Sequence, residues 1–209
     1  MDNSSIKAIV FDLGRVLVDF DHWISAKRLK DFCDSSEEEI YQLFFDSELT
    51  CLFEEGKISP LEFFDEVKKI LKLKIDYPQF LPIWNEIFFF SPQNQAVYNL
   101  AKKLKSNYPV CLASNINVLH FEYLKNKFSI FDIFDKIFLS YEIKARKPSL
   151  LMYRTILESL SLSPQEVFYT DDRPPLVESA QKLGIKSFVF LGVDKLKKDL
   201  LSLKVRLDD

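Results

Sequence analysis

Several polar side chains of this sequence stand directly after short apolar runs. Asp12, Ser114 and the carboxylate pair Asp171 and Asp172 each follow such a run, and Lys147 stands at the start of a predicted helix. Short apolar runs are typical of buried parallel strands, and ligands bind outside the carboxyl ends of such strands. An edge that gathers carboxylates, a hydroxyl and an ammonium group is placed for chemistry on a bound ligand, since carboxylates are nucleophiles and ligands of hard cations.

Each of these residues also has a plainer interpretation. Asp12 can begin a turn or cap the next helix, and Ser114 and Asp172 are residue types that cap helices. Independent coincidences at corresponding places of the chain are improbable, so the pattern as a whole favours a site.

The elements that would position these groups form an α/β pattern. Residues 1–16 hold one strand, and from residue 91 onward predicted strands alternate with helices, which indicates right-handed crossovers and a doubly wound, Rossmann-like parallel sheet. Residues 24–90 have a helical pattern without a convincing strand, so an all-helical block is inserted after the first strand. Inside it we predict helix starts at Ser35 and Ser36 with Glu38 and at Ser59 with Glu62, separated by a turn at 54–57.

Composition excludes several classes of protein. The chain has 209 residues, 28 basic and 31 acidic side chains and a formal net charge of -3, so nucleic acid is not expected as a partner. Three dispersed cysteines without CxxC spacing argue against disulfides and structural zinc, and two distant histidines argue against a histidine metal site. No apolar run approaches membrane-spanning length and no secretory signal pattern opens the chain, so we expect a cytoplasmic protein without a membrane partner.

The same residues resemble the four motifs of the haloacid dehalogenase superfamily, whose members are mostly magnesium-dependent phosphatases. FDLGRVLVD from Phe11 resembles the first motif, LASN around Ser114 the second, RKP around Lys147 the third and YTDD ending at Asp172 the fourth. The helical insertion, residues 17–90, is placed like a cap domain over a core of residues 1–16 and 91–209. The combination is similar to sugar-phosphate phosphatases such as bacterial glucose-1-phosphatase and the phosphatase domain of soluble epoxide hydrolase.

The resemblance implies a role for each matching residue. Asp12 would attack phosphorus and form an aspartyl-phosphate, while Mg²⁺ would be held by Asp12, the Gly14 carbonyl, Asp172 and, as a further candidate, Asp171. The residues implied to bind the phosphoryl group or the rest of the substrate are Ser114, Asn115, Lys147, Arg15 and, from the turn of the cap, Lys57. For Lys57, an exposed turn without a ligand is an equally good interpretation.

The sequence departs from the family pattern at Gly14. Most phosphatases of the superfamily carry an Asp there that protonates the leaving oxygen, a contribution worth roughly 10²- to 10⁴-fold, so slow turnover or a need for good leaving groups is expected. In the fourth motif, Pro175 and Leu176 stand where many relatives carry a polar residue that orients the metal. Asp19 could assist in catalysis, or could be structural.

The sequence therefore predicts a Mg²⁺-dependent, monomeric hydrolase of a small phosphorylated metabolite, with sugar phosphates as the expected substrates. The alternative from the same fold is a catalytically weakened protein that binds a phosphorylated metabolite or a partner. A metal-free dehalogenase acting through Asp12 is a third hypothesis, against which the pair at 171 and 172 argues.

Overall fold

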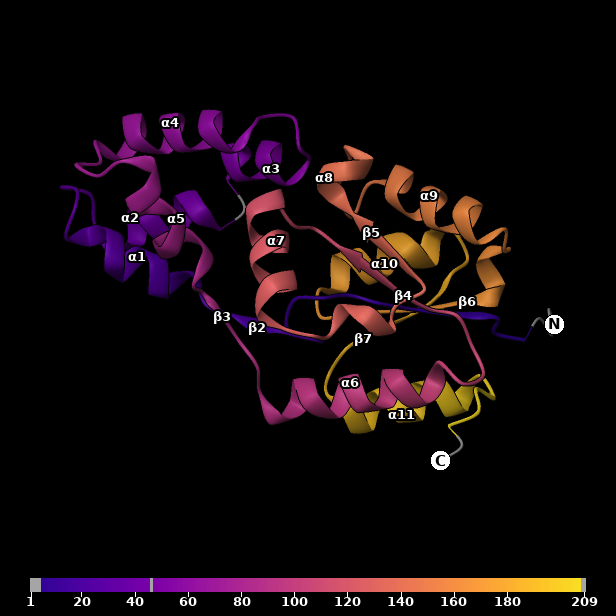
Figure 1. Ribbon diagram of the computed structural model, residues 1–209. Coiled ribbons are helices and arrows are strands. Elements are labelled where there is room, and N and C mark those ends of the chain that lie inside the picture. Colours follow the sequence, from indigo (N-terminus) through magenta and orange to yellow (C-terminus); the bar gives the residue numbers. More distant parts are fainter. Residues whose placement is uncertain (1–4, 46, 208–209) are drawn as a thin grey trace.

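The core of the protein is a sheet of five parallel strands in the order β5-β4-β1-β6-β7, flanked by helices (Figure 1). The computed structural model describes residues 5–45 and 47–207. The strands are β1 Ala8–Phe11, β4 Val110–Ser114, β5 Lys136–Leu139, β6 Val167–Asp171 and β7 Lys186–Val189. This confirms the predicted α/β, Rossmann-like fold with its parallel sheet.

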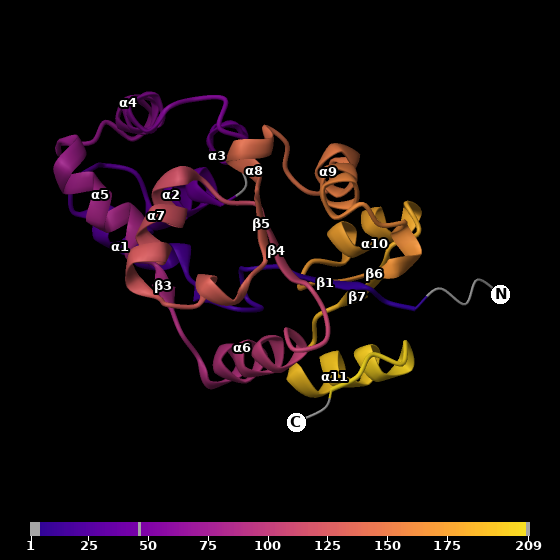
Figure 2. The same cartoon turned by 45° about the vertical axis from the view of Figure 1, so that its right-hand side comes forward.

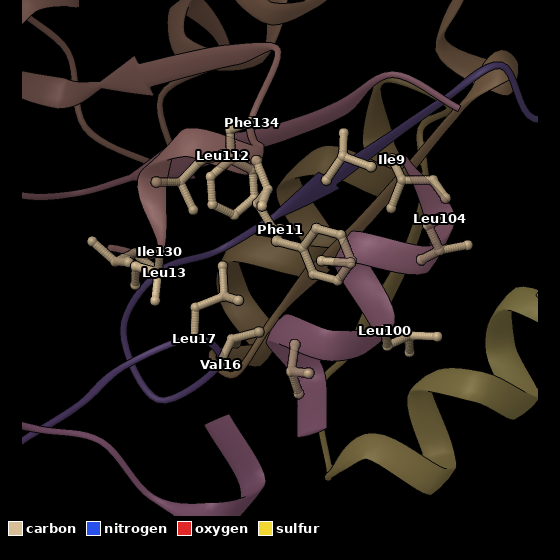
Figure 3. Close-up of a cluster of buried hydrophobic side chains, with 14 of the residues drawn as sticks. Ile9, Phe11, Leu13, Val16, Leu17, Leu100, Leu104, Leu112, Ile130 and Phe134 are labelled. Atoms are coloured by element: carbon tan, nitrogen blue, oxygen red, sulfur yellow. The ribbon is translucent and has the colours of Figure 1, made fainter. Parts of the chain in front are cut away.

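The central strand β1 is buried on both faces because successive side chains point to opposite sides of the sheet. Ile9 and Phe11 belong to the apolar cluster on one face, and Val10 belongs to the cluster on the other. Figure 3 shows the first cluster, in which β1 side chains lie with Leu100, Leu104 and other apolar residues. β1 is thus fixed on four sides, with β4 and β6 as its neighbours in the sheet.

Helices cover both faces of the sheet, and α7 adds Phe121 and Leu124 to the apolar cluster that α6 and α11 share. Figures 1 and 2 show α6 and α11 side by side on one face, and α9 and α10 on the other. The helices of this part are α6 Pro92–Leu104, α7 Val118–Lys127, α8 Ser140–Ile143, α9 Leu150–Leu160, α10 Pro174–Lys182 and α11 Val193–Ser202, with 3-10 turns at Phe131–Ile133 and Pro164–Glu166.

Five further helices form a separate group beside the sheet, which we call the helical module. They are α1 His22–Lys30, α2 Glu37–Phe44, α3 Glu48–Glu54, α4 Pro60–Leu71 and α5 Tyr77–Asn85. The module has its own buried cluster of apolar and aromatic side chains, distinct from the two clusters on the sheet. Its chain enters and leaves through β2 Asp19–Phe20 and β3 Phe88–Phe89, which pair antiparallel.

The structure confirms one predicted helix start of the module and corrects two details of the prediction. Ser59 caps α4 and exchanges hydrogen bonds with Glu62, as predicted, whereas the partner of Ser36 in the capping box of α2 is Glu39 rather than Glu38. The prediction that residues 24–90 hold no strand is wrong at β3, because a two-residue strand is set by its long-range partner β2 and not by local pattern. Among the described residues, no helix is both long and apolar enough to cross a bilayer.

Candidate active site

Asp12 lies at the carboxyl end of the central strand. Its backbone N–H donates to the carbonyl of Thr170 at 2.9 Å, which extends the pairing of β1 with β6 by one residue. The residue is 7 % exposed. The carboxylate is therefore held at the sheet edge between the ends of β4 and β6, at the place where such folds bind ligands.

Lys147 reaches this edge from the segment that precedes α9. Its Nζ donates to Oδ1 of Asp12 at 2.5 Å, to Oδ2 of Asp171 at 2.7 Å and to the carbonyl of Ala113 at 2.9 Å. An ammonium group has three protons, so all of them are used. The side chain is 1 % exposed, and its charge is compensated by two carboxylates.

Asp171 and Asp172 differ in how many hydrogen bonds their carboxylate oxygens already accept within the protein. Oδ2 of Asp171 accepts from Lys147 and from the hydroxyl of Tyr169, and Oδ1 accepts from the N–H of Arg173 at 2.9 Å. Asp172 is half-buried and lines the cavity described below. One ligand atom from each of Asp12, Asp171 and Asp172 lies within 4.8 Å of the others. Asp172 is therefore the more available of the pair for a cation, whereas Asp171 holds Lys147.

Negative charge exceeds positive charge in this cluster. Burial raises the pKa of Asp12 to about 7, assisted by Asp171 and opposed by Lys147. Burial and Asp171 also raise the pKa of Asp172. Burial alone would lower the pKa of Lys147, but Asp12 and Asp171 together raise it above its usual value. The raised pKa values show that the cluster lacks the positive charge needed to keep its carboxylates ionised. A hard divalent cation, which prefers oxygen ligands, would supply that charge.

Ser114 and Asn115 continue from the end of β4. Ser114 is buried and lines the cavity. The side chain of Asn115 accepts from the N–H of Lys147 at 2.7 Å and donates to its carbonyl at 2.8 Å. Asn115, predicted to bind substrate, lines the cavity and also ties the Lys147 backbone to β4.

The loop after Asp12 turns sharply back toward β2. The N–H of Arg15, whose φ of 57° is left-handed, donates to the carbonyl of Val18 at 2.7 Å. An ideal Cβ on Gly14 would lie 2.8 Å from Cε1 of Phe20, and the Arg15 guanidinium carbon lies 5.3 Å from the centre of the same ring. The position at which the resemblance expects an acid is therefore covered by an aromatic ring.

These groups form one end of a cavity of about 180 Å³. Its walls come from the sheet edge, the loop after β1, the helical module and β3. The residues that line it are Asp12, Leu13, Gly14, Arg15, Val18, Phe20, His22, Phe44, Phe45, Glu54, Ile87, Phe88, Ser114, Asn115, Ile116, His120, Arg146, Lys147, Asp172, Arg173 and Leu176.

Lys57 does not line this cavity. Its Nζ lies 2.6 Å from Oε2 of Glu55, and the side chain is 52 % exposed. The resemblance places this turn near the active site, but here the neighbouring carboxylate holds the lysine in an exposed turn. Asp19 does not line the cavity either, since side chains alternate along β2 and Phe20 faces inward.

Sequence reasoning missed other residues of the cavity. Glu54 and Arg146 form an ion pair of 2.7 Å; each belongs to a segment singled out from sequence, the turn at 54–57 and the RKP motif, but neither was predicted as a site residue. Phe45, Phe88 and His120 come from three distant segments, and no spacing in the sequence connects them.

Comparison with known proteins gives a consistent picture. A family described as Haloacid dehalogenase-like hydrolase matches residues 9–190. A D-ribitol-5-phosphate phosphatase from Bacteroides thetaiotaomicron is 26% identical over 196 residues, which cover 88% of this chain and 91% of that protein. A HAD family enzyme from the same organism, solved in complex with magnesium and inorganic phosphate, has a TM-score of 0.76 and 29% identity, covering 88% of this chain and 94% of that one.

A further relative is similar over a shorter segment. A drimenol cyclase from Aspergillus calidoustus is 36% identical over 90 residues, which cover 43% of this chain and 17% of the cyclase. The chain thus spans about one sixth of that relative's length, so the similarity concerns one segment of the larger protein.

Proposed function

The chain belongs to the haloacid dehalogenase-like hydrolase family, and on this premise we propose that it is a Mg²⁺-dependent phosphatase that hydrolyses small phosphate monoesters through an aspartyl-phosphate on Asp12. The observation that carries the proposal is the bond between Lys147 and Asp12 at one end of a cavity, with Asp172 beside them. Relatives named as a phosphatase and solved with magnesium and phosphate support the same reaction.

The donor set at this end of the cavity fits magnesium. Asp12 and Asp172 are the proposed carboxylate ligands and the Gly14 carbonyl the proposed third ligand, while Asp171 contributes its charge and holds Lys147. When bound, Mg²⁺ neutralises the charge of the phosphoryl oxygens so that a carboxylate can approach them.

In the first step, a carboxylate oxygen of Asp12 forms a bond to phosphorus while the bond from phosphorus to the leaving oxygen breaks. Lys147 favours the ionised form of Asp12 and fixes the direction of its carboxylate. The leaving oxygen takes its proton from water, because Gly14 offers no acid. Water then attacks the aspartyl-phosphate, which releases phosphate and restores Asp12.

Binding of the phosphoryl group falls to donors at the same end of the cavity. The Ser114 hydroxyl and the Arg15 guanidinium both line it, and both can donate to anionic oxygen. Asn115 contributes by holding Lys147 in place. Donors fixed before substrate arrives need no reorganisation in the transition state.

We propose that residues 17–90 act as a cap over a core of residues 1–16 and 91–209. Contacts between the turn after α3 and the core support this role: the Ser140 hydroxyl donates to the Glu54 carbonyl at 2.6 Å, and Lys144 donates to the Gly56 carbonyl at 2.7 Å. A cap in this place excludes water from the cavity. It also closes the site within one chain, which agrees with a monomer.

The name of the D-ribitol-5-phosphate phosphatase supports sugar and polyol phosphates as one candidate substrate class, in agreement with the prediction from sequence. The natural substrate would then be a small phosphorylated metabolite. Three free thiols suit the reducing cytoplasm, where we propose that the protein acts.

The test is phosphate release from a panel of sugar phosphates and one aryl phosphate, with Mg²⁺ and with a chelator. We expect metal-dependent release that falls by at least about 10³-fold in Asp12→Asn. Asp34→Asn makes the same chemical change at an exposed surface position and should leave the rate unchanged. Tight Mg²⁺-dependent binding of phosphate without hydrolysis of any ester would instead identify the weakened binding protein. Release that is insensitive to chelator would refute the metal site.

A further inference from the structure

Part of the cavity is lined by aromatic rings, which we call the aromatic wall: Phe20, His22, Phe45, Phe88 and His120. Neighbouring rings of the wall pack against one another. Their centres are 5.4 Å apart for Phe20 and His22, 6.1 Å for His22 and Phe45, and 5.0 Å for Phe88 and His120. The wall begins beside Gly14, where the Phe20 ring lies. A leaving group attached to phosphorus at Asp12 would therefore lie along these rings.

The aromatic wall has little hydrogen-bonding capacity. Nε2 of His120 lies 3.0 Å from the Trp84 carbonyl, and its Nδ1 lies 3.1 Å from the amide nitrogen of Asn117, so both ring nitrogens are used. Within the wall, Nδ1 of His22 is the one buried polar side-chain atom that lacks a partner. A polyol brings several hydroxyl groups into this space, and each one that is buried without a partner weakens binding.

The charged groups of the cavity have other partners: the Arg15 guanidinium, 5.3 Å from the centre of the Phe20 ring, is the donor proposed above for the phosphoryl group. Glu54 and Arg146 both line the cavity, but they form an ion pair with each other at 2.7 Å. The hydroxyl of Ser140, which lies next to this pair, donates to the Glu54 carbonyl. An apolar group needs no hydrogen bond from these residues, whereas a sugar does.

The size of the cavity limits the leaving group. The cavity measures about 180 Å³ and is partly open to solvent, so this volume limits the part of the substrate that it can enclose. An apolar cavity of roughly 150 Å³ holds one benzene molecule. The space thus suits one ring or a short branched chain beside the phosphate.

We propose that the preferred substrates are phosphate monoesters with an apolar leaving group the size of one ring, an inference that rests on the proposed phosphatase function. It departs from the polyol phosphates that the name of the D-ribitol-5-phosphate phosphatase suggests. The aromatic wall offers such a group favourable ring contacts and exclusion of water. An apolar leaving group also brings no hydroxyl that would be buried without a hydrogen-bond partner.

The test compares benzyl phosphate with D-ribitol 5-phosphate. Both are esters of primary alcohols, so the comparison measures recognition of the leaving group rather than its acidity. We expect kcat/KM for benzyl phosphate to be higher by at least about tenfold, the scale on which apolar pockets discriminate. A preference for the ribitol ester would overturn the inference and leave the phosphatase function intact. Failure to hydrolyse both of these esters and p-nitrophenyl phosphate in Mg²⁺ would refute the phosphatase function itself.

A matched pair of variants locates the preference in the aromatic wall. Phe45 and Phe89 are 36% and 48% exposed, so replacing either should be compatible with folding, but only Phe45 lines the cavity. Phe45→Ala should raise KM for benzyl phosphate by at least about fivefold and leave the ribitol ester nearly unchanged, since only the apolar group loses a contact. Phe89→Ala should change neither value. Equal effects of Phe45→Ala on both esters would exclude a role of the wall in selectivity.

Discussion

Replacing Gly14 with alanine should destabilise the protein through one steric contact. An ideal Cβ at this position lies 2.8 Å from Cε1 of Phe20, whereas non-bonded carbon atoms prefer roughly 3.5–4.0 Å. The ring must therefore move by about 1 Å. Its neighbours Phe88 and His22, with ring centres 6.2 and 5.4 Å away, restrict that movement.

The size of the effect follows from this overpacking. Inserting a methyl group into a packed site costs about 1–3 kcal/mol of unfolding free energy. If the Phe20 ring is the obstacle, Gly14→Ala introduced into the Phe20→Ala variant should lower the free energy of unfolding by less than about 0.5 kcal/mol. That is the range of a surface substitution that disturbs no packing. The coupling energy between the two positions should then be at least about 0.5 kcal/mol.

The assay is urea unfolding of the wild type, Gly14→Ala, Phe20→Ala and the double variant. Phe20→Ala by itself loses the contacts of the ring. The quantity compared is therefore the loss of unfolding free energy caused by Gly14→Ala in the wild type and the loss it causes in the Phe20→Ala variant. Equal costs of Gly14→Ala in both backgrounds would refute the steric argument.

The same background decides whether the ring excludes an acid. Gly14→Asp combined with Phe20→Ala should hydrolyse benzyl phosphate at least about tenfold faster than Gly14→Ala combined with Phe20→Ala, which lacks only the carboxyl group. The gain should be small for p-nitrophenyl phosphate, whose leaving oxygen needs no proton. A gain of equal size for both esters would show that the carboxyl group does not act as an acid.

Further predictions concern the carboxylate pair, the buried histidines and a buried thiol. Asp172→Asn should raise the Mg²⁺ concentration needed for half-maximal activity by at least about tenfold. Asp171→Asn should mainly lower the free energy of unfolding, by about 3 kcal/mol, because it removes one carboxylate from the buried Lys147. Mg²⁺ titrations and urea unfolding of both variants test this, and a larger effect of Asp171→Asn on the Mg²⁺ requirement than on stability would contradict it. Burial lowers the pKa of His120 to about 3 and that of His22 to about 4. Unfolded histidines bind protons below about pH 6.5 that the folded ones refuse, so stability should fall as the pH decreases from about 6.5 toward 3, by up to about 5 kcal/mol for His120, and His120→Gln should flatten the measured dependence. Burial raises the pKa of Cys111 to about 11, so iodoacetamide should leave it unmodified in the native protein at pH 8 and label it after unfolding, as mass spectrometry can show.

The sequence was informative where local chemistry decides the outcome. The capping box of Ser59 and Glu62 and the strand that ends at Asp12 involve neighbours in the chain, and both were predicted. The convergence of Asp12, Ser114 and Lys147 on one cavity follows from the rule that parallel strands share an edge.

Other features depend on which distant segments meet. Lys57 has a carboxylate two residues away, and that local ion pair holds it in an exposed turn. The role of Asn115 could not be predicted because its partners are backbone atoms of Lys147, which any residue there would present. The ring of Phe20 beside Gly14 depends on how the loop after β1 turns, and the sequence carries no signal for that packing.

The central position of β1 has a consequence for how the chain folds during synthesis. β1 leaves the ribosome first, but its register partners Val110 in β4 and Val167 in β6 follow only about 100 and 160 residues later. At translation rates of roughly 5–20 residues per second, this apolar strand waits for several seconds without its neighbours in the sheet. The helical module, which has a core of its own and emerges in between, can fold during that interval. A strand made late therefore completes the environment of the first, so the surroundings of Asp12 are assembled only after β6 has been translated.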